Sequence, residues 1–395
     1  MPAKLVRELG EMEELVEEIL TRLPPDEPGN LLRASLVCKP WRGLLASHGF
    51  CRHYGDFHRT PPMLGYLHDW PKTRAELFPT TDFLARGPDH EHQYSVKHCR
   101  HGRVLLSYKD DNQPIFVVWD PMTGGQTVLC RPEMLGVSRW QASVLCATDS
   151  CSHGDCHSGR FVVVFVTLDD QEGVATTSAY SSETSTWCSP ALTAIAAFEE
   201  EIDFYDSPSV LVGDALYFLV FREQEDEVTE DSILKEYDMG KSCLSEILLP
   251  EEEVERASNN PILMVGEDGR LGIAHLFFYC LSVWWREVDP DGVASWTQQI
   301  DIDLKTNHFP LGNFSIPPEL GGSVEGTGII FVISKVGTYM IDRKSQSSKR
   351  LSSKLYQRPN VRWSLFPYVS FYYPPAAAGL VAEASSEAGH GNEEA

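Results

Sequence analysis

The sequence predicts a small all-α unit, residues 1–56, followed by an all-β domain, residues 57–375, and a disordered tail, residues 376–395. Three observations predict this order. Apolar residues recur at helical spacing before Asp56, and short strand-length runs replace that pattern after Pro61. The end of the chain is rich in Ala, Gly, Ser and Glu and has no apolar periodicity, as is typical of disordered segments.

The first helix is predicted from a run of aliphatic residues with glutamates between them. Pro24 and Pro25 end this helix, and a second apolar helix is expected from Leu31 to Val37. Pro40 can begin a third helix, because the N–H group that proline lacks is not needed in a first turn. The aliphatic residues of the first helix are Leu15, Val16, Ile19, Leu20 and Leu23, and the third helix carries Trp41, Leu44 and Leu45.

The β domain is predicted from runs of β-branched and aromatic residues that alternate with Gly, Asp, Asn and Pro. No helical pattern of convincing length interrupts these runs. The clearest of them are Arg103–Ser107, Ile115–Trp119, Arg160–Thr167, Ala215–Phe221, Ile262–Val265, Leu271–Phe278 and Gly328–Ser334.

A loose repeat underlies the strands. Each copy has an aromatic or aliphatic residue, an acidic residue, a turn and a further strand, as in Trp119–Leu129. The acidic markers are Asp120, Glu183, Asp238, Asp289 and Asp342, at steps of 63, 55, 51 and 53 residues. A period of about 50 residues suits one four-stranded blade of a β-propeller. A propeller must pair its ends to remove exposed edges, so we expect the apolar segment Trp363–Tyr373 to complete the blade that begins near Met63–Leu67.

Composition limits the partners and the compartment. The 395 residues include 33 basic and 57 acidic side chains, which give a net charge of −24 and a pI near 4.9. The negative electrostatic field of such a charge repels nucleic acid and anionic membranes. No apolar run approaches the roughly 18–20 residues that span a bilayer, and the N-terminus does not read as a signal peptide. We therefore expect an intracellular protein, nuclear or cytoplasmic, whose ten cysteines stay reduced.

The N-terminal segments Glu14–Pro25 and Leu31–Leu45 together resemble an F-box, particularly those of the large F-box families of grasses. Members of these families often continue with a stretch similar to Phe57–Gly65. One difference from the family pattern is Gly10-Glu11-Met12, where many F-boxes have a Leu-Pro pair before the first helix. The β domain resembles the kelch-related propellers that follow some plant F-boxes, although Gly124-Gly125 and Gly321-Gly322 are its only glycine doublets.

The resemblance implies a substrate-receptor subunit of an SCF-type ubiquitin ligase, which is not itself an enzyme and needs no cofactor. Its F-box would bind a Skp-type adaptor and, through it, the cullin and RING subunits, while the β domain would bind a protein substrate. By resemblance, the following residues divide between the adaptor interface and the F-box core: Leu15, Ile19, Leu23, Pro24, Leu31, Leu32, Val37, Cys38, Trp41 and Leu45.

Two other functional classes remain open. The β domain is alternatively a small-molecule-binding or enzymatic propeller with a vestigial F-box, and the chain is alternatively an interaction protein that docks on the adaptor without substrate turnover. The sequence has no Gly-x-Ser-x-Gly, phosphate-binding loop or His-Glu-x-x-His motif. The aromatic pairs Trp284-Trp285 and Phe277-Phe278 favour a core role over a ligand-stacking face.

A segment with several soft metal ligands lies between two expected strands. Cysteine thiolates and histidine imidazoles are the ligands of structural zinc, but the segment lacks paired Cys-x-x-Cys spacing, and Ser, Gly and Asp fill its gaps. An ordinary loop without metal is the expectation here, and likewise at the scattered His90, His92, His98 and His101. The residues of the segment are Cys146, Cys151, His153, Cys156 and His157.

Overall fold

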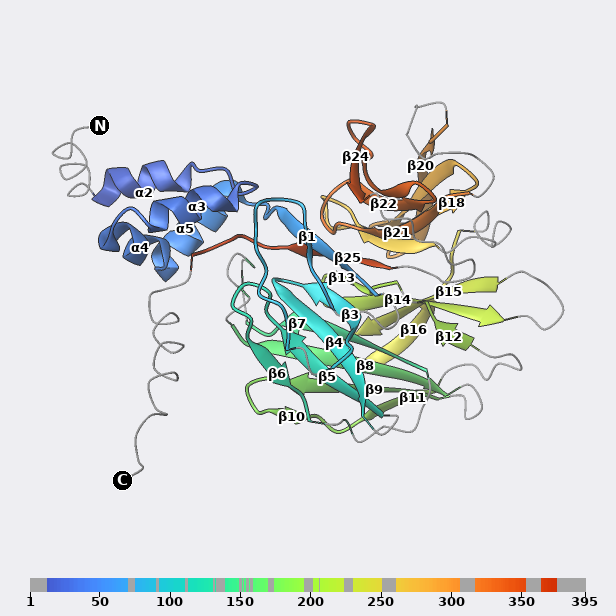
Figure 1. Ribbon diagram of the computed structural model, residues 1–395. Helices are drawn as coiled ribbons and strands as arrows, with labels where there is room; N and C mark the ends of the chain where they lie inside the picture. Colours follow the sequence, from blue (N-terminus) through green and yellow to red (C-terminus); the bar gives the residue numbers. More distant parts are fainter. Residues whose placement is uncertain are drawn as a thin grey trace, which may run out of the picture.

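A computed structural model gives the structure of the protein (Figure 1). It describes residues 13–69, 75–89, 92–110, 113–130, 132, 139–148, 151, 153, 156, 159–169, 174–194, 202–205, 207–223, 230–250, 261–305, 317–352 and 364–374. Within this part of the chain, the α-helices lie at the N-terminal end and the elements that follow them are strands joined by turns and loops, so the predicted fold class is confirmed. The expected tail, residues 376–395, lies outside the described residues, and no described helix is long and apolar enough to cross a membrane.

The N-terminal unit contains four described helices, one more than the sequence predicted. The fourth helix begins after Ser47, whose side chain accepts a hydrogen bond from the backbone N–H of Phe50 at 3.2 Å. This capping satisfies one of the free N–H groups of a first turn. The helices are α2 (Glu13–Thr21), α3 (Pro28–Ser35), α4 (Lys39–Leu45) and α5 (His48–His58).

Six antiparallel sheets form the blades of a propeller (Figure 1). Blade 1 contains β3 (Ser95–Arg100), β4 (Arg103–Asp110), β5 (Gln113–Trp119) and β6 (Gln126–Val128). Blade 2 contains β7 (Trp140–Cys146), β8 (Phe161–Asp169), β9 (Val174–Ser181), β10 (Thr186–Trp187) and β11 (Ala191–Ala194). Blade 3 contains β12 (Ile202–Phe204), β13 (Val210–Val212), β14 (Ala215–Glu223), β15 (Glu230–Asp238) and β16 (Cys243–Ile247).

The remaining three blades complete the ring. Blade 4 contains β17 (Ile262–Val265), β18 (Leu271–Phe277), β19 (Cys280–Val288) and β20 (Ala294–Asp303). Blade 5 contains β21 (Glu319–Ser323), β22 (Ile329–Ser334), β23 (Gly337–Asp342) and β24 (Ser347–Ser352). Blade 6 combines β1 (Met63–His68) and β2 (Phe78–Pro79) with the C-terminal β25 (Leu365–Val369).

The two ends of the β domain pair in blade 6. β1 and β25 are antiparallel, with Met63 opposite Val369 and His68 opposite Leu365. The pairing therefore confirms the expected closure between the terminal apolar segment and the first strand. It removes the free edges that an open ring of blades would expose.

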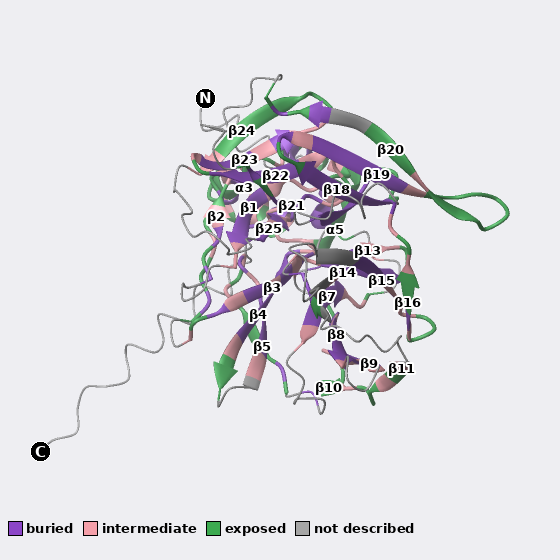
Figure 2. Cartoon of the chain, turned by 90° about the vertical axis from the view of Figure 1, so that its right-hand side faces the viewer, coloured by how far each residue is buried: buried purple, intermediate pink, exposed green. Residues whose placement is uncertain are grey.

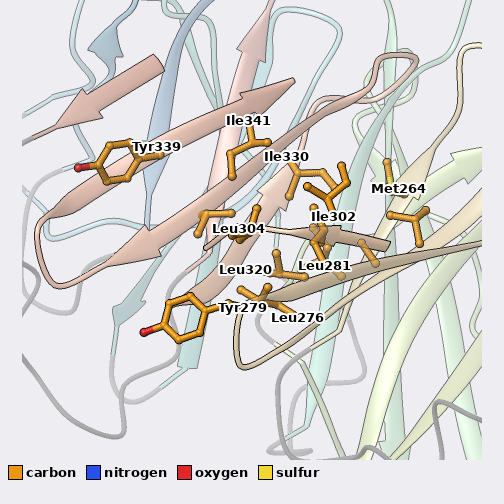
Figure 3. Packing of buried hydrophobic residues seen from close by; sticks show 14 of the residues in the cluster. Met264, Leu276, Tyr279, Leu281, Ile302, Leu304, Leu320, Ile330, Tyr339 and Ile341 are labelled. Atoms are coloured by element: carbon orange, nitrogen blue, oxygen red, sulfur yellow. The ribbon is translucent and has the colours of Figure 1, made fainter. Parts of the chain in front are cut away.

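The core of the propeller lies between its blades. Six clusters of buried apolar residues each join two neighbouring blades, and one of them, between blades 4 and 5, appears in Figure 3. In that cluster Leu281 and Ile302 of blade 4 meet Leu320 and Ile330 of blade 5. The hairpin that joins β19 and β20 is exposed at its tip (Figure 2). Because these clusters lie between blades, each sheet buries its apolar side chains only against the neighbouring sheets, and the blades stabilise one another around the ring.

The acidic markers of the sequence repeat lie at the equivalent turn of blades 1 to 5. The carboxylates of Asp120, Asp289 and Asp342 each accept a hydrogen bond from a backbone N–H within that turn, at 2.8–2.9 Å. Aspartate forms such turns with its own backbone. Glu183 differs, because its carboxylate pairs with Arg160 at 2.8 Å and the Ser181 hydroxyl accepts the turn's N–H bond instead.

Candidate functional site

The F-box and the propeller share a buried cluster. After β25 the chain enters the helical unit, where Phe371 and Tyr373 are buried against α5. The ring of Tyr54 meets Phe371 edge-on at 5.7 Å, and its hydroxyl donates to the carbonyl oxygen of Leu23 at 2.8 Å. Burial raises the pKa of Tyr54 well above its ordinary value. A second contact joins the N–H of Gly29 to the carboxylate of Asp82 at 3.0 Å.

Large apolar side chains are exposed on the helical unit. Leu15 and Ile19 lie one turn apart on α2, and 53% of Ile19 is accessible. Leu32 on α3 is similarly exposed, and Val37, two residues beyond α3, is 52% exposed. An exposed apolar patch of this kind is typical of an interaction surface.

The ten residues that the resemblance assigns to the adaptor interface or the F-box core differ in burial: some are buried, some partly buried and some exposed. Leu31 and Leu45 are fully buried in the helical core. Leu23 and Trp41 are partly buried and pack against that core, and Cys38 is partly buried at the N-terminus of α4. The exposed ones are Leu15, Ile19, Pro24, Leu32 and Val37.

Sequence reasoning missed one prominent surface residue. Leu36, at the C-terminal end of α3, is 73% exposed, more than any other large apolar side chain of the described F-box. Leu36 follows Leu32 by four residues, so the two lie on the same face of the helix, and this spacing could have indicated that Leu36 belongs to the same surface. The Gly10-Glu11-Met12 segment lies outside the described residues.

A cavity of about 360 Å³ lies where the central channel opens beside α5. Gly55 and Arg59 line it from the helical side, and the inner strands of several blades line the rest. Two charged groups from blades on either side of blade 6 meet there: the Arg100 guanidinium of blade 1 donates a hydrogen bond to the Glu325 carboxylate of the β21–β22 turn in blade 5. Burial lowers the pKa of Arg100 and raises that of Glu325, and each charge partly offsets the other's shift.

His98 joins three blades at the wall of this cavity. Its Nδ1 accepts from the N–H of Val144 in blade 2 at 3.3 Å, so its Nε2 carries the proton and donates to the Ser209 carbonyl oxygen, beside blade 3, at 3.2 Å. Desolvation, with the nearby Arg100 charge, lowers the pKa of His98 to about 3. The imidazole is therefore a neutral structural bridge at physiological pH.

The other sequence candidates separate into core and surface. Trp284 and Trp285 are buried, as expected for core residues, whereas Phe277 and Phe278 are exposed. Among the described residues, the one group of at least three potential metal ligands is Cys146, Cys151, His153 and Cys156. His90 and His157 lie outside the described residues.

Comparison with protein families identifies the helical unit. The F-box domain model matches residues 13–53, from the start of α2 into α5. This match confirms the F-box that the sequence resembled. A comparison with curated proteins finds no match.

Several solved structures are distantly similar to the chain. TolB from Acinetobacter baumannii is 10% identical with a TM-score of 0.42, and the match covers 80% of this chain and 70% of that one. A DUF4784 family protein from Bacteroides caccae is 13% identical with a TM-score of 0.42, covering 77% of this chain and 74% of that one. An alpha-L-arabinofuranosidase from Fusarium graminearum is 10% identical with a TM-score of 0.36, covering 67% and 82%.

Proposed function

We propose that the chain is a non-catalytic substrate-receptor subunit of an SCF-type E3 ubiquitin ligase. The observation that carries the proposal is an F-box at residues 13–53 joined through a buried cluster to a closed propeller. The F-box binds a Skp-type adaptor and, through it, the cullin and RING subunits. The propeller binds a protein substrate.

The adaptor surface consists of the exposed apolar residues of the F-box. Fully burying a leucine-sized side chain contributes about 1.5–3 kcal/mol, so a few such residues can sustain a stable contact. The exposure of Leu15, Ile19, Leu32, Leu36 and Val37 supports their assignment to this surface. Leu31 and Leu45 support it from within the core.

The function of such a receptor is to raise the effective concentration of the substrate beside the ubiquitin-charged enzyme. The geometry of this chain suits that task. A flexible linker would spread the substrate over many positions, whereas β25 runs from the ring directly to the buried Phe371 and Tyr373. A plant origin and a kelch-related propeller belong to the same proposal and rest on sequence resemblance. An intracellular location, nuclear or cytoplasmic, also belongs to it and is supported by the F-box match.

The test compares two leucines of equal exposure. Leu36 in the F-box and Leu192 in blade 2 are both 73% exposed. We expect Leu36→Asp in the full chain to weaken binding to a purified Skp-type adaptor at least tenfold by calorimetry, while Leu192→Asp leaves the affinity unchanged. Equal affinities for both variants and the wild type would contradict the assignment of this surface.

A second measurement separates a ligase receptor from a protein that only docks. The complex of the chain with the adaptor is mixed with cullin and RING subunits, and its assembly is followed by size-exclusion chromatography. Recovery of the four-subunit complex supports the receptor. Adaptor binding without cullin recruitment would instead favour docking without substrate turnover.

The channel cavity favours a second candidate function, a propeller that binds a small molecule. About 360 Å³ is enough for a small organic ligand, and the Arg100–Glu325 pair supplies polar contacts. A thermal-shift screen of metabolites against the wild type and Glu325→Gln tests this candidate. A ligand that stabilises only the wild type would support it.

A further inference from the structure

Four soft ligand atoms converge in blade 2. Cys146 ends β7, and Cys151, His153 and Cys156 follow in the connection to β8. The four ligand atoms all lie within 4.8 Å of one another. The Sγ atom of Cys156 is the centre of the group, because it lies 3.5 Å from the Sγ of Cys146, 3.1 Å from the Sγ of Cys151 and 3.1 Å from the Nδ1 of His153.

This spacing matches the ligand shell of a zinc ion. Zinc binds thiolate sulfur at ~2.3 Å and imidazole nitrogen at ~2.0–2.1 Å in a tetrahedron, whose edges are then about 3.5–3.8 Å long. The three separations from the Sγ atom of Cys156, 3.1–3.5 Å, are equal to or slightly shorter than that edge length, and no separation in the group exceeds 4.8 Å, so small side-chain rotations would centre an ion among the four atoms. Three thiolates and one imidazole are also the ligand types that favour zinc over harder cations.

A buried cation beside the cluster provides independent support. Arg103, which begins β4, is almost completely buried, and its Nη2 donates to the carbonyl oxygen of Gly159 at 2.5 Å. Its Nη1 is buried without a hydrogen-bond partner among the described residues, and the guanidinium interacts electrostatically with the thiols of Cys146, Cys156 and Cys151 and with the Asp120 carboxylate. Zinc with three thiolates carries a net charge of −1, which this guanidinium offsets. Metal-bound sulfur would also be an acceptor for the unpaired N–H groups.

We propose that Cys146, Cys151, His153 and Cys156 bind a structural Zn²⁺ ion. All four positions of the tetrahedron are filled by protein, which is typical of structural sites and leaves none for a substrate. Binding releases the thiol protons to solvent, and no redox step is involved. The sequence pattern disfavoured this site because its Cys-x-x-x-x-Cys spacing is unusual, but the close approach of Cys146 to Cys156 replaces a Cys-x-x-Cys pair.

The ion would shape the channel cavity. His153 lines that cavity, and its ring stacks on His101 of the β3–β4 turn at 3.8 Å with an interplanar angle of 6°. A metal that holds Nδ1 of His153 therefore also positions the wall that blades 1 and 2 present to the channel.

The metal content of the full-length chain tests the proposal. The protein is expressed with zinc in the medium, purified without chelators and analysed by inductively coupled plasma mass spectrometry. We expect about one zinc per chain in the wild type and in the control Cys130→Ser, whose thiol lies outside the cluster. Cys146→Ser and Cys156→Ser should lose it.

A measurement on the unaltered protein covers the case in which these variants fail to fold. Cobalt(II) added to metal-free wild type should give the intense visible bands of tetrahedral coordination and a sulfur-to-cobalt charge-transfer band, and zinc should abolish both. Metal-free wild type that gives only the weak bands of octahedral cobalt would overturn the proposal. So would a Cys151–Cys156 disulfide in freshly purified protein that contains no zinc.

Discussion

The hydroxyl of Tyr373 donates a hydrogen bond to the backbone carbonyl oxygen of Cys51 over 3.0 Å, although 322 residues separate the two in the sequence. The bond lies inside the F-box core, where Phe371 and Tyr373 pack beside Tyr54. The F-box of this protein is therefore completed by residues from the far end of the chain.

Tyr373→Phe should destabilise the F-box. The substitution leaves the buried Cys51 carbonyl without this donor, which costs about 1–3 kcal/mol. Urea unfolding of the full chain, followed by far-UV circular dichroism, measures the loss. The matched control is Tyr372→Phe, at the partly buried neighbour whose ring packs edge-to-face with Phe83. This control should change the unfolding midpoint little. Equal midpoints for both variants would contradict a role for the Tyr373 bond.

Three truncations should separate ring closure from completion of the F-box. Deletion of residues 376–395 should leave the melting temperature unchanged. Deletion from residue 371 keeps β25 but removes Phe371 and Tyr373, whose individual truncation to Ala would cost ~3–5 kcal/mol. We expect a folded propeller that no longer binds the adaptor. Deletion from residue 361 also removes β25 and should unfold the β domain; if the first and third truncations were equally stable, closure would not matter to stability.

Gly322→Ala should open the junction between blades 5 and 6. Gly322 has φ +141°, and a Cβ there would lie 2.7 Å from the carbonyl oxygen of Leu365 in β25. Side chains rarely adopt that backbone conformation, so relief requires β25 to move. The melting temperature should fall by several degrees, whereas it should stay within a degree or two in Gly87→Ala, where a Cβ meets nothing within 4 Å.

His98 should contribute to acid sensitivity. Its folded pKa of about 3 lies below the unfolded value of 6.5, so the unfolded chain binds more protons between these values. The stability of the folded state is therefore complete above pH 6.5 and falls as the pH drops toward 3. At pH 5 the loss is about 2 kcal/mol. His98→Gln, which keeps an amide donor for the Ser209 carbonyl, should be less stable at pH 7.5 but lose less stability between pH 7.5 and 5. Parallel pH profiles in urea unfolding would refute this contribution.

Trp41→Ala and Leu32→Asp should each weaken adaptor binding by about 2 kcal/mol or more, as buried anchors do. The two substitutions should weaken adaptor binding for different reasons. Trp41 packs against the F-box core, so its truncation should also lower the unfolding midpoint, whereas Leu32 is exposed and its substitution should not. Calorimetry with the adaptor, alongside denaturation of the chain alone, distinguishes the two effects.

Much of the fold was predictable because its signals are local. The aliphatic spacing of α2 and the aspartates of the blade turns act within a few residues. Ring closure was predictable for a different reason. The apolar segment 363–373 would leave an exposed strand edge unless it paired with another strand, and the first strand of the ring was the one available. The fourth helix was missed because α5 contains two glycines and several histidine and aromatic residues, which are poor helix formers.

The site was less predictable because its contacts are long-range. Burial alone distinguishes Leu31, in the core, from Leu32, on the surface, and the two are adjacent in sequence. The approach of Cys146 to Cys156 depends on the path of the β7–β8 connection, which spacing does not reveal. The contribution of Phe371 and Tyr373 to the F-box has no local signal at all.

The course of the chain from β25 into the F-box core has a consequence for biosynthesis. The F-box leaves the ribosome first, but its buried core is incomplete until Phe371 and Tyr373 have been synthesised. These two residues follow the strands of all six blades in the sequence. A stalled or prematurely terminated chain thus carries an F-box that lacks its last two supports. Only a chain that has been translated to the end of its ring contains the complete F-box core, so a shortened chain should have a destabilised F-box surface.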